Sequence, residues 1–546
     1  MNIAQFLLSR LKSLGVDHVF GIPGDYILPL FETMVDSEVQ HVAACNELNA
    51  GYATDGYARL KGLGAVAVTY GPGSFSLVNA VASAYAERTP LVVISGGPAR
   101  EKYISQPHMH HILPGRWDAS LKIFAQVTVQ ATRLTDPQQA VEQIDAALQI
   151  CQATMRPVFL EIPMDLQMVD IGDPPAYQPG VATGDEQSIT DALDSITRRL
   201  TSAKRPVVLV GHEIHSAQLQ DKVIELVQRN GLAVGSMFTG KADFLEQIPE
   251  CLGVYHGAGS LPDAREFVED ADAVLFLGAV DSDFNMGGST AKLSSEQMIH
   301  VFDEKVRIDG QQFDSVPITA VVDGLLARLP GGLDSAKDAP VQSFPHNARN
   351  PYDADAHAPI TNKRIYDRLA HFIRPRDIVL ADAGCSINMA YVQLPADTRY
   401  ITSAYWASIG MGFGATFGAC FAAEADQRVI AVEGDGAFQM TAQELSSMVR
   451  YKKTPIVIVV NNKGYTAERL IHDGPFNDIP DWRYHLLPVA YGGVEGEDVH
   501  SEGDLENALA RAETFTGPGP LVIEIHIDPF DASEAFKRMS EGLRHR

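Results

Sequence analysis

Short runs of apolar and β-branched residues recur along the chain, separated by stretches with helical periodicity. Each run ends in glycine or a polar residue, as in GAVAVTYG, PLVVISG, RPVVLVG, DAVLFLGA, DIVLADAG, RVIAVEGDG and TPIVIVVNN. Strands that are apolar on both faces are typical of parallel sheets covered by helices. The sequence therefore predicts an α/β protein built from doubly wound parallel sheets.

Two segments interrupt this alternation, at residues 171–186 and 330–359. Both are rich in proline and small residues, as is typical of interdomain linkers. A chain of 546 residues is too long for one hydrophobic core. The linkers divide it into three predicted domains, at residues 1–175, 187–330 and 355–546.

The first and third predicted domains end with similar strands. RPVFLEIPMD at residues 156–165 and GPLVIEIHID at residues 519–528 share proline, glutamate, isoleucine and aspartate positions. The match suggests one topology for both domains and an origin by duplication. A buried parallel strand would also account for the apolar residues without common ancestry.

The composition of the chain argues against some classes of binding partner. The net charge of -26 repels nucleic acids and anionic lipids, so neither is expected as a partner. No apolar run approaches the roughly 18 residues that a membrane span needs, and the N-terminus lacks a signal-peptide core. The five scattered cysteines have no CxxC spacing and indicate reduced thiols. A cytoplasmic protein is expected.

The most specific pattern joins the GDG triplet at residues 434–436 to an asparagine pair at residues 461–462. A strand followed by a tight turn and a helix N-terminus forms a site for an anion such as diphosphate. Asp435, Asn462 and the Gly464 carbonyl offer the hard oxygen ligands that Mg²⁺ prefers. GDG alone is a common turn, and the asparagine pair on the neighbouring strand favours the binding interpretation.

Glu47 begins a predicted helix that is crowded with alanine, glycine and tyrosine. Small residues let backbones approach closely, so this helix is expected to pack inside the fold. A buried carboxylate without a partner is costly, whereas a protonatable carboxyl group suits proton chemistry. The alternative is an acid that only stabilises the helix N-terminus.

The GDG-to-NN stretch resembles the diphosphate and metal signature of thiamine-diphosphate-dependent enzymes. The closer resemblance is to the 2-keto acid decarboxylases, in the indolepyruvate and phenylpyruvate branch of the pyruvate decarboxylase family. It is carried by FGIPGDY at residues 20–26, by His110 and His111, and by GDGAFQMTAQEL and NNKGYTAE. The resemblance covers the whole chain and implies pyrimidine-binding, central and diphosphate-binding domains in this order.

The resemblance implies conversion of a 2-keto acid to an aldehyde and CO₂ with thiamine diphosphate and Mg²⁺. In this family the glutamate matching Glu47 hydrogen-bonds the aminopyrimidine ring and promotes loss of the thiazolium C2 proton. Proton handling is assigned to Asp25, His110, His111 and Glu468, since the product carbon must be protonated before aldehyde leaves. The histidine tract could instead bind a transition metal, but no cysteine or carboxylate joins it at close sequence spacing.

Further site residues follow from the resemblance. Ile409 matches the apolar wedge that bends the cofactor. DAGCS replaces a TGDS-like turn, so Ser386 and backbone N–H groups, rather than Cys385, are expected at the diphosphate. The implied cofactor contacts are Glu47, Ser386, Ala407, Ser408, Ile409, Gly434, Asp435, Gly436, Ala437, Asn462, Gly464, Tyr465 and Thr466.

The substrate pocket is assigned to Ile387, Ala467 and Ile471. In pyruvate-preferring relatives, the positions of Ile387 and Ala467 carry an aromatic and a bulky aliphatic residue. The smaller side chains leave room beyond a methyl group, which predicts a preference for aromatic, branched or long-chain 2-keto acids over pyruvate.

Two other functions remain open at this stage. A carboligase or acetolactate synthase-like enzyme is disfavoured by Asp25 with the histidine pair. A nucleotide-binding regulatory protein with a degenerate site is disfavoured because Asp435, Asn462 and Glu47 are all present. The resemblance also implies a homodimer as the minimum and a homotetramer as the expected assembly, with sites formed between subunits. The central domain is expected to be structural or regulatory, without flavin.

Overall fold

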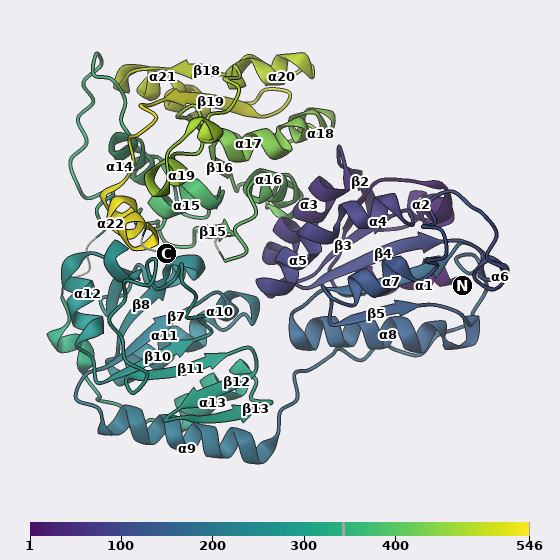
Figure 1. Cartoon of the computed structure of the whole chain (residues 1–546), viewed down its shortest axis with the longest axis horizontal. Coiled ribbons are helices and arrows are strands. Elements are labelled where there is room, and N and C mark those ends of the chain that lie inside the picture. Colours follow the sequence, from purple (N-terminus) through teal and green to yellow (C-terminus); the bar gives the residue numbers. More distant parts are fainter. Residues whose placement is uncertain (341–343, 404, 545–546) are drawn as a thin grey trace. The chain divides into compact units, whose positions relative to one another are not determined.

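The computed structural model describes residues 1–340, 344–403 and 405–544. The regular structure consists of three β-sheets and the helices that flank them (Figure 1). The chain forms two compact units. One contains Met1–Ala182, Gly410–Ala425 and Thr441–Thr454, and the other contains Thr183–Ile409, Asp426–Met440 and Pro455–Arg546.

The first sheet has six parallel strands in the order β2-β1-β3-β4-β6-β5. Its apolar core is formed with α1, α2 and α8 on one face, whereas Tyr57 of α3 contacts Phe20 on the other. The strands are β1 (His18–Gly21), β2 (Gln40–Ala43), β3 (Gly64–Val68), β4 (Leu91–Gly97), β5 (Gln130–Arg133) and β6 (Val158–Pro163). The helices are α1 (Ile3–Ser13), α2 (Leu28–Val35), α3 (Glu47–Lys61), α4 (Pro72–Ser76), α5 (Val78–Ala86), α6 (Arg100–Ser105), α7 (Ala119–Phe124) and α8 (Pro137–Thr154).

The third sheet repeats this topology. Its six parallel strands have the order β15-β14-β16-β17-β19-β18, which matches the first sheet strand for strand. The strands are β14 (Ile378–Ala381), β15 (Arg399–Thr402), β16 (Val429–Gly434), β17 (Ile456–Asn461), β18 (Glu497–Val499) and β19 (Leu521–His526). The helices that follow residue 360 are α14 (Asn362–Phe372), α15 (Ala383–Met389), α16 (Met411–Ala422), α17 (Asp435–Thr441), α18 (Leu445–Arg450), α19 (Thr466–Ile471), α20 (Leu487–Ala490), α21 (Glu502–Glu513) and α22 (Glu534–Leu543). Of these, α16 and α18 belong to the compact unit of the first sheet. The single topology expected from the matching strands β6 and β19 is therefore present.

The central sheet departs from the purely parallel prediction. Its order is β13-β12-β11-β10-β7-β8-β9, and β12 and β13 pair antiparallel at one edge. The strands are β7 (Pro206–Val210), β8 (Ala233–Met237), β9 (Cys251–Tyr255), β10 (Ala273–Leu277), β11 (Met298–Phe302), β12 (Lys305–Ile308) and β13 (Gln311–Asp314). The helices are α9 (Glu186–Ser202), α10 (Glu213–Ser216), α11 (Gln220–Asn230), α12 (Pro262–Glu269) and α13 (Ile318–Arg328). The short antiparallel strands alternate buried and exposed side chains or are largely exposed, a pattern that the apolar runs did not reveal.

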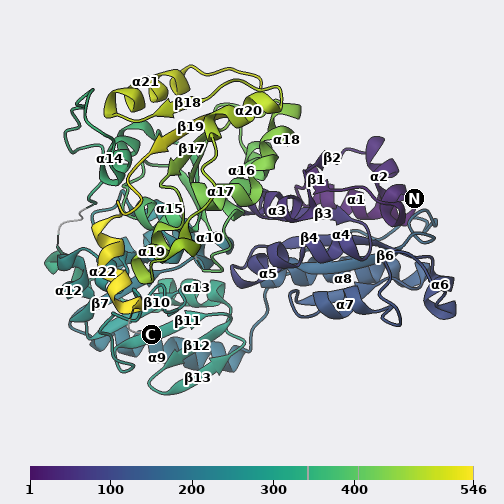
Figure 2. The ribbon, with the colours of Figure 1, turned by 45° about the horizontal axis from the view of Figure 1, so that its top comes forward.

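Helices α3 and α16 lie side by side in both ribbon views (Figures 1 and 2). A Cβ atom at Gly56 of α3 would lie 2.2 Å from the Ala415 carbonyl oxygen of α16. At Gly418 of α16 it would lie 1.7 Å from the Ala53 carbonyl oxygen of α3. Glycine at these two positions is thus required for the close approach, and the prediction that the small-residue helix is buried is confirmed from Asn49 to Ala58.

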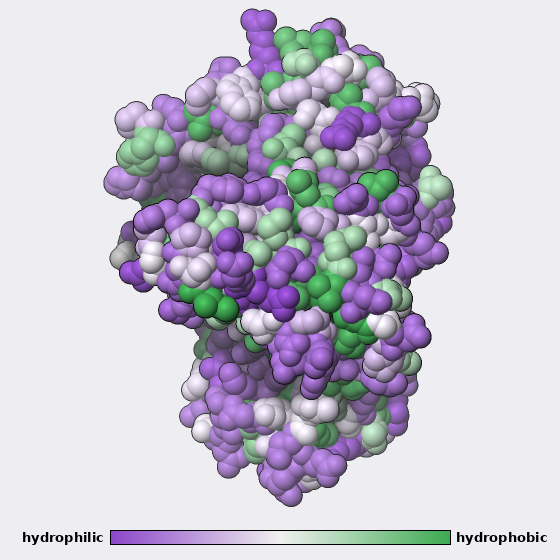
Figure 3. Space-filling model, turned by 90° about the vertical axis from the view of Figure 1, so that its right-hand side faces the viewer, coloured by the Kyte–Doolittle hydropathy of each residue, from purple (hydrophilic) through white to green (hydrophobic). Residues whose placement is uncertain are grey.

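The visible face of the molecule is largely hydrophilic, with apolar side chains scattered over it (Figure 3). Among the helices of the described residues, none combines the length and the apolar composition needed to cross a membrane.

A buried ion pair joins the central sheet to the segment that follows α15. Lys241 and Glu246 are 2% and 1% exposed and contact each other. The Lys241 ammonium donates to the carbonyls of Ala390 and Val392, at 3.1 and 2.8 Å. Burial raises the pKa of Glu246 to about 7, although Lys241 opposes the shift. The pair is therefore costly to build and more costly to break.

Replacement of Lys241 by methionine is expected to destabilise the chain by about 3–5 kcal/mol, because it leaves the Glu246 carboxylate buried and unpaired. Urea unfolding followed by circular dichroism measures the loss. The double variant Lys241→Met with Glu246→Leu is the control and should recover much of the stability, since neither charge remains. An unchanged unfolding midpoint in the single variant would contradict this assignment.

Candidate active site

The carboxyl ends of β14, β16 and β17 meet at one edge of the third sheet, because these strands are parallel neighbours. Asp382, Asp435 and Asn462 are the residues that directly follow the three strands. In open parallel sheets, ligands bind outside this edge. The residues of the predicted diphosphate and metal pattern are thus brought together by strand order.

Asp435 is nearly inaccessible, with 1% of its surface exposed. Its Oδ1 accepts a hydrogen bond from the backbone N–H of Gly436 at 2.8 Å, and its Oδ2 accepts one from Gly464 at 3.1 Å. Burial raises the pKa of Asp435 to about 6, and the backbone donors reduce that shift. A cation beside the carboxylate would favour its charged form further.

The side-chain amide of Asn462 faces the Gly464 carbonyl and the Asp435 carboxylate. One of its terminal atoms lies 2.6 Å from the Gly464 carbonyl oxygen and 3.1 Å from Asp435 Oδ1. In one orientation the amide nitrogen donates to both oxygens, and in the other the amide oxygen joins them as a ligand for a cation. Adjacent ligands of an octahedral Mg²⁺ ion lie about 2.9 Å apart, given Mg–O distances of 2.0–2.1 Å. The donor set therefore fits a bound magnesium ion.

Arg469 of α19 fixes the loop that carries these ligands. Its guanidinium donates to the carbonyls of Asn462 and Lys463, at 3.1 and 2.7 Å, and to the Asp478 carboxylate at 2.8 Å. Gly464 adopts φ +143°, and a Cβ there would lie 2.1 Å from the Asn477 carbonyl oxygen. The loop can take this path only with glycine at position 464 and a long, buried donor such as Arg469.

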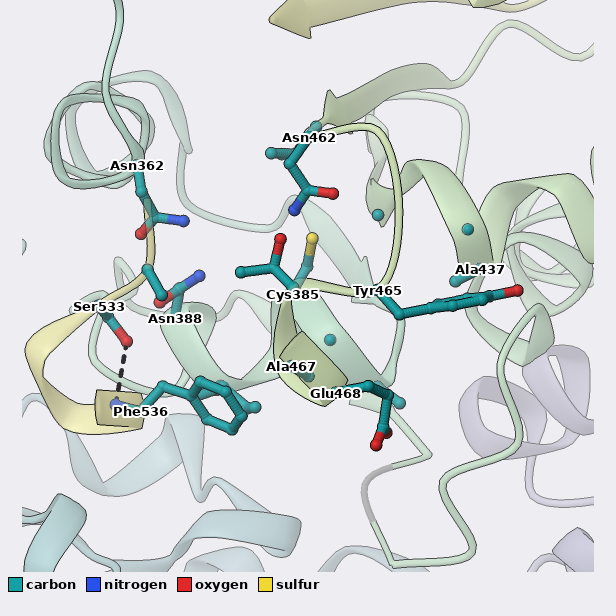
Figure 4. A pocket seen from close by; sticks show the side chains of 18 of the residues that line it. Asn362, Cys385, Asn388, Ala437, Asn462, Tyr465, Ala467, Glu468, Ser533 and Phe536 are labelled. Atoms are coloured by element: carbon teal, nitrogen blue, oxygen red, sulfur yellow. Dashed lines mark hydrogen bonds between the residues drawn. The ribbon is translucent and has the colours of Figure 1, made fainter. Parts of the chain in front are cut away.

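A pocket of about 280 Å³ opens beside Asp435 and Asn462 (Figure 4). Fourteen residues expected at the site line it: Ile387, Ala407, Ile409, Gly434, Asp435, Gly436, Ala437, Asn462, Gly464, Tyr465, Thr466, Ala467, Glu468 and Ile471. A Cβ at Gly434 or Gly384 would meet nothing within 4 Å, so the backbone is open to a ligand at both places. At Gly436 a Cβ would lie 2.5 Å from the Tyr465 ring, which explains the glycine.

Ser386 and Ser408 do not line this pocket, although both were expected to contact the cofactor. The Ser386 hydroxyl donates to the Ala383 carbonyl at 2.7 Å, within its own helix. Cys385, whose contact with the diphosphate the sequence left open, does line the pocket, and burial raises the pKa of its thiol. The rotation of α15 about its axis decides which of its side chains faces the pocket. The DAGCS motif alone does not predict that rotation.

Asp25, His110 and His111 form a cluster within the other compact unit. The Nε2 of His110 lies 2.6 Å from the Oδ2 of Asp25, and the Nδ1 of His111 lies 3.9 Å from its Oδ1. The Tyr26 ring stacks on His110, with ring centroids 5.3 Å apart. A carboxylate therefore does join the histidine pair in space, which sequence spacing did not indicate. This group can transfer protons, and its ligand atoms could also hold a metal.

Glu47 begins α3, and Asn46 caps the helix by accepting from the Asn49 N–H at 2.8 Å. Glu47 itself is half-buried rather than fully buried. A second carboxylate that the sequence did not indicate, Glu444, is fully buried and accepts hydrogen bonds from Asn49 Nδ2 and Cys45 N, at 2.7 and 3.2 Å. Burial raises the pKa of Glu444. The start of α3 is thus fixed by polar contacts that leave the Glu47 carboxyl group available.

Three family models, in the same order as the three sheets, match most of the chain. Residues 1–119 match the N-terminal TPP binding domain of thiamine pyrophosphate enzymes, residues 193–329 their central domain, and residues 382–525 their C-terminal TPP binding domain. The chain is 33% identical over 553 residues to indole-3-pyruvate decarboxylase of Azospirillum brasilense, covering 100% of this chain and 98% of the relative.

Two fungal relatives are similarly close. Pyruvate decarboxylase of Aspergillus fumigatus is 32% identical over 558 residues, covering 100% of this chain and 97% of the relative. Pyruvate decarboxylase isozyme 1 of Saccharomyces cerevisiae is 32% identical, covering 98% of this chain and 97% of the relative. The chain belongs to the thiamine-diphosphate-dependent 2-keto acid decarboxylases.

Membership in this family makes the chain a thiamine-diphosphate-dependent carboxy-lyase. The features missed by sequence reasoning are Arg469, Glu444 and the C-terminal helix α22. Phe536 and Leu543 of α22 line the pocket, although they lie far from every motif in the sequence. The amphipathic pattern of α22 indicates a buried face without indicating what it contacts.

Replacement of Arg469 by lysine is expected to weaken Mg²⁺-dependent retention of the cofactor by roughly 10- to 100-fold, the usual effect of losing a residue that orients metal ligands. A single ammonium cannot reach both loop carbonyls and Asp478 in the geometry of a planar guanidinium. Titration of the metal-depleted protein with Mg²⁺ at fixed thiamine diphosphate measures the change.

The matched control is Arg368→Lys, which disrupts a two-point contact with Glu506 on α21 instead. It should leave cofactor retention as in the wild type. Equal Mg²⁺ requirements in the two variants would show that Arg469 does not position the ligands.

Proposed function

We propose that this decarboxylase uses Mg²⁺ and prefers aromatic, branched or long-chain 2-keto acids over pyruvate. The observation that carries the proposal is the apolar wall of the pocket. Ile387 and Ala467 belong to an apolar cluster with Phe536, and Phe284 and Leu543 also line the pocket. Each additional methylene that a substrate buries there is worth about 0.8 kcal/mol.

The small side chain of Ala467 supports this preference. It directly precedes Glu468, one of the residues proposed to handle protons, and both line the pocket (Figure 4). A substrate oriented with its reacting carbon near Glu468 would place its side chain against Ala467 and Ile387. A pyruvate methyl group would leave part of this apolar wall uncovered, whereas a larger side chain would cover it.

Bound thiamine diphosphate supplies the electron sink for loss of CO₂. We propose that Asp435, Asn462 and the Gly464 carbonyl hold Mg²⁺ against the diphosphate, and that Glu47 holds a proton at the aminopyrimidine ring. Asp25, His110, His111 and Glu468 are proposed to deliver the proton that releases the aldehyde. A carboxylate hydrogen-bonded to an imidazole, as in Asp25 and His110, keeps the imidazole oriented for proton transfer.

The proposal includes an assembly of at least two chains, with a homotetramer expected. The two ends of the cofactor need two kinds of domain, and Glu47 and Asp435 belong to different compact units. A cytoplasmic location is also proposed, supported by the five free cysteines.

A panel of 2-keto acids tests the substrate preference. Phenylpyruvate, indolepyruvate, 4-methyl-2-oxopentanoate and pyruvate are compared by kcat/KM for aldehyde and CO₂ formation, with thiamine diphosphate and Mg²⁺ present. The larger acids should be preferred, and Ala467→Ile should lower kcat/KM for them by roughly 5- to 150-fold, because overpacking costs about 1–3 kcal/mol. Pyruvate turnover should change much less.

Ala510→Ile is the control, since the same volume is added on the exposed face of α21. A wild-type preference for pyruvate would refute the pocket argument while leaving the decarboxylase activity in place. Acyloin as the main product would instead favour a carboligase.

Replacement of Glu47 by glutamine is expected to lower kcat by roughly 100- to 10,000-fold, the usual range for loss of one general acid–base group. Glutamine keeps the shape of the side chain but cannot supply the carboxyl proton. Exchange of the cofactor C2 proton into deuterated water, followed by NMR, separates this step from binding. Glu32→Gln, on the exposed side of α2, is the control.

The Glu47→Gln variant also tests whether each active site is formed by two chains. Mixed dimers of Glu47→Gln and Asp435→Ala chains should regain part of the activity if each site takes Glu47 from one chain and Asp435 from another. Mixed dimers that form but remain inactive would indicate sites built within single chains.

A further inference from the structure

A cluster of three histidines and two carboxylates lies at the β18–β19 edge of the third sheet. Its members are His485, Asp498, His500, Glu524 and His526. Asp498 of β18 pairs with Glu524 of β19, and His526 follows Glu524 by two residues. Because side chains alternate along a strand, these three share one face, opposite the apolar face formed by Val499, Ile523 and Ile525.

The ligand atoms of this edge cluster converge on one oxygen. The Nε2 atoms of His526 and His500 lie 2.8 and 3.2 Å from Asp498 Oδ1. The Nδ1 of His485 lies 3.9 Å from the same oxygen and 2.6 Å from Glu524 Oε2. The rings of His500 and His526 stack with centroids 4.2 Å apart and planes 5° apart, so both present Nε2 to the same point.

These distances suit a small metal ion. In a tetrahedral site with bonds of about 2.0–2.2 Å, neighbouring ligand atoms lie about 3.3 Å apart. The 3.2 Å separation of Asp498 Oδ1 from the His500 nitrogen is close to that value. The His526 nitrogen lies at the hydrogen-bond distance of 2.8 Å and would move slightly outward when an ion binds. Imidazole with carboxylate is a donor set for Zn²⁺, Co²⁺ or Ni²⁺, whereas Mg²⁺ prefers oxygen ligands.

The matching strand β6 in the first sheet offers an internal comparison. Glu161 of β6 occupies the position of Glu524, and both are almost completely buried. Arg133 neutralises Glu161 by a contact of 2.5 Å, and the Tyr103 hydroxyl donates to it at 2.6 Å. The first domain thus balances this carboxylate with a permanent positive charge.

Glu524 has no such partner. Its carboxylate accepts a hydrogen bond from Asn461 Nδ2 at 2.7 Å and lies 2.6 Å from His485 Nδ1. Neither of these side chains carries a permanent charge. Within the described part of the chain, no lysine or arginine forms an ion pair with Glu524 or Asp498. Two adjacent carboxylates surrounded by three imidazoles are electrostatically balanced by a divalent cation.

We propose that the edge cluster binds one divalent transition-metal ion of the Zn²⁺ class. Asp498, His500 and His526 are the ligands, and Glu524 orients His485 as a further ligand or neighbour. The ion ties the edge strand β18 and the segment around His485 to β19. The site is distinct from the magnesium ligands at Asp435 and Asn462, and it does not depend on the substrate preference proposed above.

Equilibrium dialysis of the holoenzyme against Zn²⁺, with thiamine diphosphate and Mg²⁺ saturating, tests the proposal. The wild type should bind one more Zn²⁺ ion per chain than the double variant His500→Ala with His526→Ala. Zn²⁺ should raise the midpoint of thermal unfolding of the wild type but not of that variant, because a ligand stabilises only the state that binds it. Substitution with Co²⁺ should give visible absorption bands that the double variant lacks.

The control is His357→Ala, which removes an exposed histidine of the same domain outside the cluster. It should bind as much Zn²⁺ as the wild type. Zn²⁺ could also bind at Asp25 with its histidines or at Asp435 and Asn462. The double variant keeps both of these sites, so such ions do not change the difference in Zn²⁺ stoichiometry between it and the wild type. Equal stoichiometry in the wild type and the double variant would overturn the proposal.

If the double variant does not fold, Asp498→Asn replaces it, because this change keeps the shape of the side chain and removes the charge that the histidines share. Loss of the additional Zn²⁺ ion in a folded Asp498→Asn protein supports the site. Its retention there overturns the proposal.

Discussion

The buried carboxylate of Asp435 is the constraint on which the diphosphate site depends. A nearly inaccessible carboxylate is stable in its charged form only if its surroundings supply positive potential. Here that potential comes from two backbone N–H groups, which belong to Gly436 and Gly464. Gly464 donates from a left-handed backbone of φ +143°, which favours glycine, and glycine at position 436 leaves room for the Tyr465 ring. Arg469 holds the loop of Gly464 in place by donating to the Asn462 and Lys463 carbonyls.

Much of this arrangement could be predicted because it is local or fixed by strand order. Apolar runs indicate buried parallel strands, and parallel neighbours place their carboxyl ends at one edge. That rule alone brings Asp435 and Asn462 together. The matching strands β6 and β19 likewise indicated two sheets of one topology, and the observed strand orders agree.

Other parts of the site could not be predicted because they depend on helical phase or on contacts distant in sequence. The phase of α15 turns Ser386 toward its own helix and presents Cys385 to the pocket. Phe536 reaches the pocket from the last helix of the chain, where nothing in the local pattern identifies its partner. Burial was also overestimated for Glu47, since small neighbours indicate a packed helix but not the environment of its first residue.

The two sheets of one topology balance the matching carboxylates of β6 and β19 in different ways. In the first sheet, Arg133 compensates Glu161. In the third, imidazole and amide groups surround Glu524 instead. Other buried carboxylates of the third domain, Asp377 and Glu502, do pair with Arg428 and Arg364. The difference is therefore local to one position, where the neighbours of Glu524 are neutral or titratable.

The central sheet contributes to the site indirectly, because none of its described strands lines the pocket. Lys241 and Glu246 bind the segment from Ala390 to Leu394, which directly follows α15. Because α15 carries both Cys385 and Ile387, this contact positions part of the pocket wall. A buried ion pair is a poor source of stability, but it tolerates little displacement. The pair is therefore better suited to define the geometry of the pocket than to strengthen the fold, which gives the central domain a direct part in shaping the pocket.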